Sequence, residues 1–401
     1  SAAAKSAEVR KAAGDRAVPT LFAEFVSIQN EIAQLMGYDN YMDYAYSDVY
    51  ERDYTVDDVH KMRALVKKYL GGGLILDYYN YKRGQRSSYS SVCGPDSKKS
   101  IFQDNKAMGI VADYFDTLQT DKYKNGVDFK AELNKLLKEG NYYTGNYDGA
   151  FSYYLSTRDN TILYFGPGSY SAPFTFVHEF GHYFNNIYNH GIDISMDHDE
   201  TQSQGDEMLF LAYLSELLTA NGEQEQFSGL EAAQMLNSLQ TILLATAVDE
   251  FEEAVYSGYY AGDNLRIKTM LENGPVSKTS YDLLFQLISE DYGLNDLYNP
   301  IYWRYVCIEA PGYYISYAMS LIPSISVYAK YCESGYEAAK EAYLKLFTFS
   351  DNPKMAHIDV AGDMLCDVDY ADILKYCGLM SAFDEKTYKS LYEIYKVCRN
   401  K

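Results

Sequence analysis

The segment H-E-F-G-H at residues 178–182 constrains this chain more than any other stretch. On an α-helix, residues four positions apart lie one above the other on the same face. His178 and His182 can therefore direct two imidazoles at one metal ion, and Glu179 lies beside them, where it can reach a metal-bound water. The preceding residues favour a helix, because Ser171 can cap its N-terminus and a proline suits its first turn.

A catalytic zinc ion has three protein ligands and one open position, so one ligand remains to be found. The polar segment 197–207 follows the first histidine pair and leads into an apolar helical run. Within it, Glu200 and Glu207 fall on one helix face. We predict Glu200 as the third ligand and Glu207 as the hydrogen-bond acceptor for a ligand imidazole. His190 and His198, which lie in the polar connection, are the alternatives for the third ligand.

One β region is expected, between Gly140 and Phe165. The residues Thr161–Phe165 are β-branched and aromatic, and a turn at Arg158–Asn160 precedes them. Two short strands joined by this turn would place an edge strand near the metal. An edge strand can pair with an extended peptide through main-chain hydrogen bonds. The alternative is a hairpin with a purely structural role.

A tyrosine-rich helix is expected to begin at Pro311 and to run to Tyr328. Tyr313 and Tyr317 are four residues apart and Tyr314 and Tyr317 are three apart, so the helix presents a tyrosine face. Aromatic packing in the core is the plain explanation of this face.

These motifs together resemble the thimet oligopeptidase and oligoendopeptidase F family of zinc metallopeptidases. The most specific match is H-E-F-G-H followed by E-x-x-S-x-x-x-E, here Glu200, Ser203 and Glu207. The segment Gly149–Ser152 resembles the G-A-[FY]-[SC] segment of the family, and Thr161–Phe165 resembles its active-site edge strand. Tyr313–Ser320 resembles its tyrosine-rich cleft helix. Scattered similarity covers most of the chain.

The resemblance implies a zinc endopeptidase that acts on short peptides and holds one zinc ion per chain. Glu179 would be the general base, and Tyr314 and Tyr317 would stabilise the oxyanion. The residues implied in substrate binding are Gly149, Ala150, Phe151, Ser152 and Tyr313. In one respect the sequence departs from the family, because residues 302–310 lack the histidine that usually precedes the tyrosine pair. Tyr305 or Arg304 would take its role, or the role is missing.

The implied fold is mainly α: a large multi-helix zincin-type fold with one small β-sheet beside the active-site helix and a deep channel between helical halves. The whole chain would form a single catalytic domain. Its parts would be a helical subdomain at 1–140, a small β region at 141–170, zinc-binding helices at 171–220 and a helical subdomain at 221–401. Since the family carries a further N-terminal region, the chain would correspond to the C-terminal, catalytic portion of a longer protein.

Helical periodicity and capping signals predict the remaining elements. Residues 74–99 are interpreted as a partly flexible connection, and the acids within 251–255 as a solvated helix face. The predicted helices are 17–39, Val59–Leu70, Lys106–Leu118, Val127–Leu137, Met208–Ala220, Leu230–Tyr256, Tyr281–Asp291, Asp359–Cys377 and Phe383–Val397.

Composition limits the classes of partner. The net charge of -21 argues against nucleic acid and against anionic membrane surfaces. No apolar run reaches the roughly 18 residues of a membrane span. Six cysteines without C-x-x-C spacing argue against a thiolate zinc site, and we expect free thiols. We expect a cytoplasmic location, with secretion or the cell surface as the alternative, and the sequence gives no oligomeric state.

Two other functions remain open at this stage. One is a catalytically impaired zinc- and peptide-binding protein, favoured by the absent histidine. The other is a zinc hydrolase of non-peptide amides, which the expected edge strand disfavours.

Overall fold

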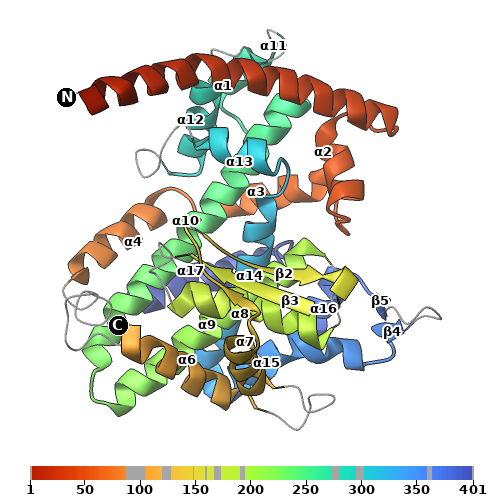
Figure 1. Ribbon diagram of the computed structural model, residues 1–401. Helices are drawn as coiled ribbons and strands as arrows, with labels where there is room; N and C mark the ends of the chain where they lie inside the picture. Colours follow the sequence, from red (N-terminus) through yellow and green to blue (C-terminus); the bar gives the residue numbers. More distant parts are fainter. Residues whose placement is uncertain are drawn as a thin grey trace. The chain divides into compact units, whose positions relative to one another are not determined.

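The computed structural model describes residues 2–86, 104–119, 128–147, 149–158, 160–166, 173–189, 195–272, 274, 276, 280–294, 302–358 and 364–399, with side chains described from residue 17 onward. The chain divides into two compact units, and each unit is assembled from two separate stretches of sequence. Unit 1 comprises Ser1–Leu76 and Leu239–Ala318, and unit 2 comprises Asp77–Ser238 and Met319–Lys401. The fold is mainly α with a small β component, as the sequence predicts (Figure 1).

Unit 1 is helical. Its elements are α1 (Ala2–Leu35), α2 (Tyr41–Tyr44), a π-helical turn at Ala45–Val49, α3 (Val56–Tyr69), the second half of α10 (Gln224–Tyr256), α11 (Leu265–Glu272), α12 (Tyr281–Asp291), α13 (Trp303–Glu309) and the start of α14 (Ile315–Ser334). The core contains a cluster of aromatic rings from four helices: Phe22, Phe251, Tyr281 and Trp303. The capping box that Thr55 and Asp58 form at the start of α3 confirms the capping signal in the sequence.

The acidic residues of α10 correct the sequence interpretation, because they are not a solvated face. Glu252 and Glu253 are only 1% and 4% exposed. Glu253 and Asp249 both form ion pairs with the buried Arg63 of α3. Glu253 also lies 2.7 Å from His60 Nε2. Buried carboxylates need such partners, since desolvation of an unpaired charge is costly.

Unit 2 contains the remaining helices and all the strands of the described chain. Its elements are the second part of α4 (Gly73–Gly84), α6 (Asp104–Thr117), α7 (Phe129–Glu139), β1 (Tyr142–Tyr143), β2 (Ala150–Leu155), a 3-10 turn at Ser156–Arg158, β3 (Asn160–Phe165), α8 (Pro173–Tyr188), α9 (Met196–Ala220), the first half of α10, the rest of α14, α15 (Tyr336–Thr348), a 3-10 turn at Phe349–Asp351, β4 (Ala356–Ile358), β5 (Met364–Cys366), α16 (Tyr370–Cys377) and α17 (Glu385–Arg399).

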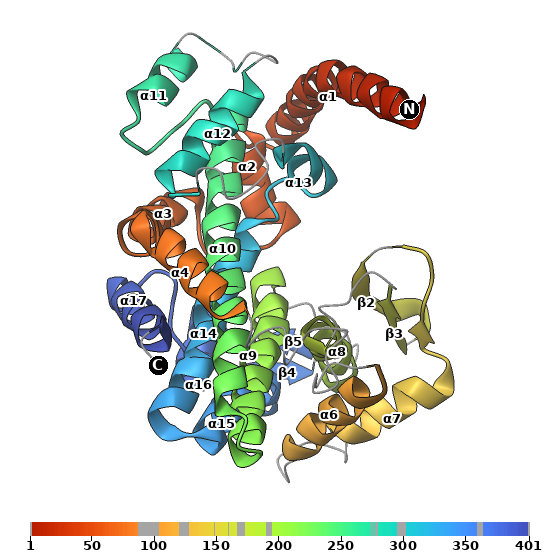
Figure 2. The same ribbon diagram turned by 90° about the vertical axis from the view of Figure 1, so that its left-hand side faces the viewer.

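Three strands form a sheet in the order β1-β3-β2, and the sheet packs against α8 (Figure 2). β2 and β3 are antiparallel, with Ser152 opposite Leu163, whereas β1 runs parallel to β3. The two predicted strands are therefore confirmed. The prediction that Thr161–Phe165 is the edge strand is wrong, because β1 covers its other side. Within the described residues β2 has β3 as its single neighbour, so β2 carries the open edge of the sheet.

Two further expectations are corrected. Of the flexible connection expected at 74–99, residues 74–84 belong to α4, and residues 87–99 lie outside the described residues. Met364–Cys366 form a strand paired with β4 where a continuous helix over Asp359–Cys377 was expected. Strands of three residues are too short to leave a periodic pattern in the sequence.

The described chain has no helix that combines the length and the apolarity needed to span a membrane. Among its described cysteines, Cys307, Cys366 and Cys377 are free thiols, and Cys93 lies outside the described residues.

Candidate metal centre and active site

The candidate site of unit 2 depends on the close packing of α8 against α9. A Cβ atom built on Gly181 would lie 3.1 Å from the Cα of Ser203, closer than the 3.5–4.0 Å usual for carbon atoms in contact. The glycine of the H-E-F-G-H segment thus lets the two helix backbones approach. At the start of α9, the side chain of Ser195 accepts a hydrogen bond from the His198 backbone N–H and caps the helix. Ser171, predicted to cap α8, lies outside the described residues.

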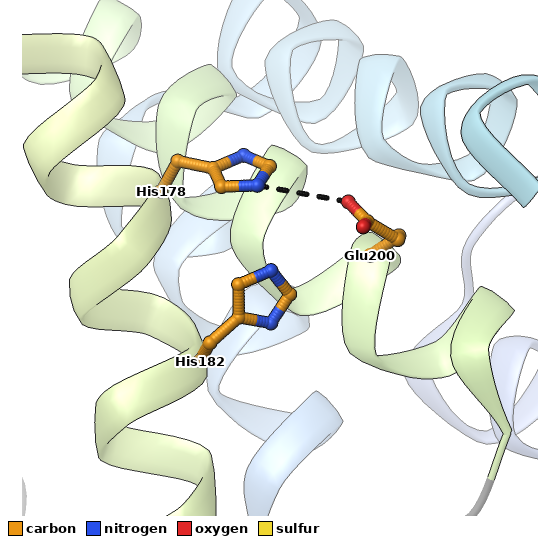
Figure 3. A group of neighbouring side chains, drawn as sticks. All are labelled: His178, His182 and Glu200. Atoms are coloured by element: carbon orange, nitrogen blue, oxygen red, sulfur yellow. Dashed lines mark ion pairs between the residues drawn. The ribbon is translucent and has the colours of Figure 1, made fainter. Parts of the chain in front are cut away.

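His178, His182 and Glu200 meet across this helix pair. Figure 3 shows the two imidazoles, one helical turn apart on α8, both directed at the carboxylate on α9. One ligand atom from each residue lies within 4.8 Å of the others. His178 Nε2 and Glu200 Oε2 are 3.6 Å apart. Two ligands of one tetrahedral zinc ion lie roughly 3.4 Å apart, so the donor types and their spacing fit zinc.

Glu207 orients the first imidazole, as its spacing from Glu200 suggests. Its Oε1 accepts a hydrogen bond from Nδ1 of His178 at 2.8 Å. Its Oε2 accepts another from the side-chain amide of Gln234 on α10, also at 2.8 Å. This arrangement fixes the proton on Nδ1 and turns Nε2 toward Glu200. No local pattern points to Gln234, because it lies 27 residues beyond Glu207 on another helix.

Burial and neighbouring charges shift the pKa values of the two histidines in opposite directions. Burial alone would lower the pKa of His178, but the hydrogen bond to Glu207 and the charges of the nearby carboxylates raise it to about 10. Burial, together with the charge of His178, lowers the pKa of His182 well below its usual value. His182 is therefore neutral, which is the form in which an imidazole binds a metal.

Glu179 lies between the histidine pair and the sheet. It is 8% exposed, and burial raises the pKa of its carboxyl to about 7. The positive charge of His178 and a hydrogen bond from the Ser152 backbone N–H of β2 act in the opposite direction. A carboxyl group with a pKa near neutrality can accept a proton and return it, which is what a general base requires.

The strand register explains why the Ser152 N–H can reach Glu179. The Gly166 N–H bonds to the Gly149 carbonyl at 2.8 Å, and the Leu163 N–H bonds away from β2, to the Asn141 carbonyl at 3.0 Å. Backbone groups alternate in direction along a strand. The N–H and C=O groups of Ala150 and Ser152 therefore point to the open edge of β2, and Ser152 presents them beside the carboxylate of Glu179.

The rival histidines do not join the described cluster. His198 is fully buried on the other side of α9, where its Nε2 lies 3.1 Å from the Leu346 carbonyl oxygen of α15. His190 lies outside the described residues.

The predicted tyrosines belong to unit 1. The hydroxyl groups of Tyr314 and Tyr302 lie 2.5 Å apart, and the ring of Tyr317 packs edge-on against Tyr314. Of the two residues considered as replacements for the missing histidine, Arg304 forms an ion pair with Asp282. Tyr305 is 63% exposed. Tyr302 therefore contacts Tyr314 from the segment where the histidine is missing, and no sequence pattern pointed to it.

The helix expected to begin at Pro311 begins at Ile315, so Tyr313 and Tyr314 lie in a turn before α14. Polar contacts within unit 1 hold this turn. Arg52 donates to the Gly312 carbonyl and to the Ser316 hydroxyl, both at 2.9 Å. Glu252 accepts a hydrogen bond from the Gly312 backbone N–H at 3.1 Å. Tyr313, predicted to bind substrate, stacks edge-on against Tyr317.

Comparison with known proteins identifies the fold. No protein-family model matches the sequence, and no curated protein matches it. Among solved structures, PZ peptidase A with an inhibitor superimposes over 96% of this chain with a TM-score of 0.69 at 15% identity. A putative oligoendopeptidase F from Bacillus anthracis covers 97% with a TM-score of 0.64 at 15% identity. The oligoendopeptidase F of Enterococcus faecium covers 100% with a TM-score of 0.54 at 14% identity.

These matches show that the chain has the fold of the oligoendopeptidase F peptidases, as its motifs predict. The chain spans 66%, 64% and 61% of the lengths of these three structures, respectively.

Proposed function

We propose that the chain is a zinc-dependent endopeptidase that hydrolyses short peptides. The observation that carries the proposal is the convergence of three groups within unit 2. These are the His178, His182 and Glu200 cluster, the carboxylate of Glu179 beside it, and the open edge of β2 that contacts Glu179 through Ser152. The fold shared with solved peptidases supports it.

His178, His182 and Glu200 would hold one zinc ion. When bound, the ion would lower the pKa of a water molecule and polarise the scissile carbonyl. Glu179 accepts the proton of the attacking water and passes it to the leaving amine. The buried position of Glu179 matches this task, because a dry environment keeps its pKa near neutrality.

The open edge of β2 would bind the peptide backbone. An extended peptide beside β2 would form hydrogen bonds with the backbone groups of Ala150 and with the carbonyl of Ser152, independently of its side chains. Gly149 begins this segment, and Phe151 lies on its outer face. This backbone recognition favours a peptide substrate over a small non-peptide amide.

The roles of Tyr314 and Tyr317 in binding the oxyanion are part of the proposal. Their hydroxyl groups are donors of the kind that stabilise a tetrahedral intermediate. The contact between Tyr302 and Tyr314 would replace the orienting role of the missing family histidine. Tyr313 would contact the substrate beside them. The channel between helical halves, which would restrict the substrate to short peptides, also remains a prediction.

Two single variants test the proposal and separate chemistry from metal binding. Glu179→Gln should retain zinc and lose cleavage of a quenched fluorescent peptide by about two orders of magnitude or more, because it removes the base. Glu200→Ala should lose zinc, measured by metal analysis of the purified protein. Undiminished turnover by Glu179→Gln would refute the role of the base, and full zinc in Glu200→Ala would reassign the ligand.

A zinc- and peptide-binding protein without catalytic activity is the second candidate. The absence of a histidine from residues 302–310 favours it. Peptide binding without chelator-sensitive cleavage would identify this alternative.

A further inference from the structure

The outer face of the three-stranded sheet, the face directed away from α8, carries a row of aromatic side chains. On the inner face, Thr161 and Leu163 are buried, and the ring of Phe165 lies 5.8 Å from Phe176 of α8. Successive residues of a strand point to opposite faces. The side chains of Phe151 and Tyr153 on β2 therefore point outward, and they are 42% and 61% exposed.

This row crosses all three strands. Tyr143 of β1 pairs with Tyr164 of β3, and Tyr164 pairs with Phe151 of β2. The rings of Phe151 and Tyr164 are stacked, with centroids 5.1 Å apart and planes 14° from parallel. The row ends at Phe151, on the strand whose far side has no neighbour among the residues that the structure describes.

The backbone register determines which residues of a bound peptide would extend the row. Ser152 directs its N–H and C=O to the open edge. Its N–H bonds to Glu179, so a peptide residue opposite Ser152 takes the hydrogen-bonded position of the ladder by donating to the Ser152 carbonyl. The peptide residues on either side of it lie opposite Phe151 and Tyr153 in non-hydrogen-bonded pairs. In an antiparallel ladder these pairs bring the Cα atoms to about 4.5 Å and the side chains into their closest contact.

Opposite residues in an antiparallel ladder point to the same face of the sheet. The peptide side chains opposite Phe151 and Tyr153 would thus lie on exposed aromatic rings, whereas the residue between them would face the α8 side, where Glu179 lies. Aromatic rings are covered well by apolar and aromatic side chains and poorly by acidic ones, which the negative face of the ring repels.

We propose that Phe151 and Tyr153 select peptides with apolar or aromatic residues at two positions that are two residues apart and that flank the residue paired with Ser152. The bound peptide runs antiparallel to β2. This inference rests on the proposed function at the same edge, and it adds a substrate class to it. Each position contributes a preference of about three- to tenfold for an aromatic or branched apolar residue over glycine.

Threonine variants test the two positions separately, because threonine keeps the β-propensity of the strand while removing the ring. The variants are Phe151→Thr and Tyr153→Thr. The matched control is Tyr143→Thr, which removes an exposed aromatic side chain (49% exposed) from the same face, two strands away from the open edge. Circular dichroism and thermal unfolding establish that all three variants are folded.

The zinc-loaded wild-type protein and the variants digest a randomised peptide library, and mass spectrometry maps the cleavage sites. The wild type should enrich apolar residues at two positions separated by one unselected residue. Phe151→Thr should erase one preference, Tyr153→Thr the other, and Tyr143→Thr neither. Unchanged profiles in both edge variants, or a loss of both preferences in the control, would overturn the proposal.

A binding measurement separates this inference from the proposed activity. Zinc-loaded Glu179→Gln is titrated by calorimetry with two peptides that differ by phenylalanine or glycine at the two positions. If the wild type cleaves nothing but the phenylalanine peptide binds more tightly, and Phe151→Thr removes the difference, the selectivity holds and the peptidase proposal fails. Equal affinity for the two peptides would overturn the selectivity. A second copy of β2 could instead occupy the edge. Equal affinity for the two peptides, together with concentration-dependent self-association that is seen by sedimentation and lost in the edge variants, would also overturn the selectivity.

Discussion

Substitution of Gly181 by alanine tests whether close helix packing builds the metal site. The added Cβ would lie 3.1 Å from the Cα of Ser203. Since the obstructing atom belongs to the backbone, it cannot turn away as a side chain would. To reach an ordinary carbon contact, the two backbones must move apart by a few tenths of an ångström. Overpacking of this kind costs about 1–3 kcal/mol.

The unfolding free energy of Gly181→Ala also contains a gain in helix propensity, because alanine is favoured over glycine in a helix by about 1 kcal/mol. A second variant is therefore needed to separate the two effects. Gly109 provides the matched control. It lies within α6, and a Cβ built on it would meet no atom within 4 Å. Gly109→Ala should therefore gain only the propensity term. The free energy of unfolding of Gly181→Ala should fall below that of Gly109→Ala by about 1–3 kcal/mol.

Urea unfolding followed by circular dichroism, with zinc chelated, measures this difference without a contribution from the metal. Zinc affinity is then measured by competition with a chromophoric chelator. Ligand positions in a metal site tolerate shifts of about 0.2 Å. The expected helix displacement exceeds that tolerance, so Gly181→Ala should bind zinc at least about tenfold more weakly. Equal stability and equal zinc affinity in the two variants would refute the packing explanation.

Three further variants are expected to change zinc affinity, pH dependence and turnover. Glu207→Gln weakens the acceptor that orients the first imidazole, and zinc affinity should fall about 10- to 100-fold in the chelator competition. Burial raises the pKa of the Glu252 carboxyl to about 8 from a usual 4.5, so its contribution to stability is present below about pH 4.5 and is lost as the pH rises through about 8. Relative to wild type, Glu252→Gln should therefore gain unfolding free energy on the order of a few kcal/mol between about pH 5 and 8, and parallel urea-unfolding profiles would contradict this. Tyr302→Phe should lower kcat for peptide cleavage about tenfold by removing the hydroxyl beside Tyr314, whereas Tyr305→Phe should leave kcat unchanged.

Helical periodicity was sufficient to predict which site residues share a face of one helix. The spacing of His178 and His182 fixes their common face whatever surrounds them. The three-residue spacing from Glu200 to Ser203, and the two turns to Glu207, likewise place those side chains on one side of α9. What spacing could not supply is the approach of the two helices, which depends on a contact between Gly181 and Ser203 across the interface.

In the sheet, the sequence pattern predicts a strand correctly but not its position in the strand order. Thr161–Phe165 has the composition of a strand, and the structure confirms that it is one. Whether it lies at the edge depends on Tyr142 and Tyr143, a two-residue strand too short to produce an alternating pattern. Because these residues pair with β3, the open edge of the sheet is β2. The strand inferred to bind the substrate backbone is therefore β2 and not Thr161–Phe165.

The burial of charged residues in unit 1 could not be predicted from the sequence. The local pattern around Glu252 and Glu253 predicts a solvated helix face. Their burial depends on partners that are distant in sequence. Arg63 lies 190 residues before Glu253. Glu252, in turn, accepts the backbone N–H of Gly312, 60 residues further on. A buried carboxylate is tolerated only when such donors arrive from other elements, so its environment cannot be read from its neighbours in the chain. Gly312 lies in the same turn as Tyr313 and Tyr314, so the misread Glu252 holds the backbone that carries these tyrosines.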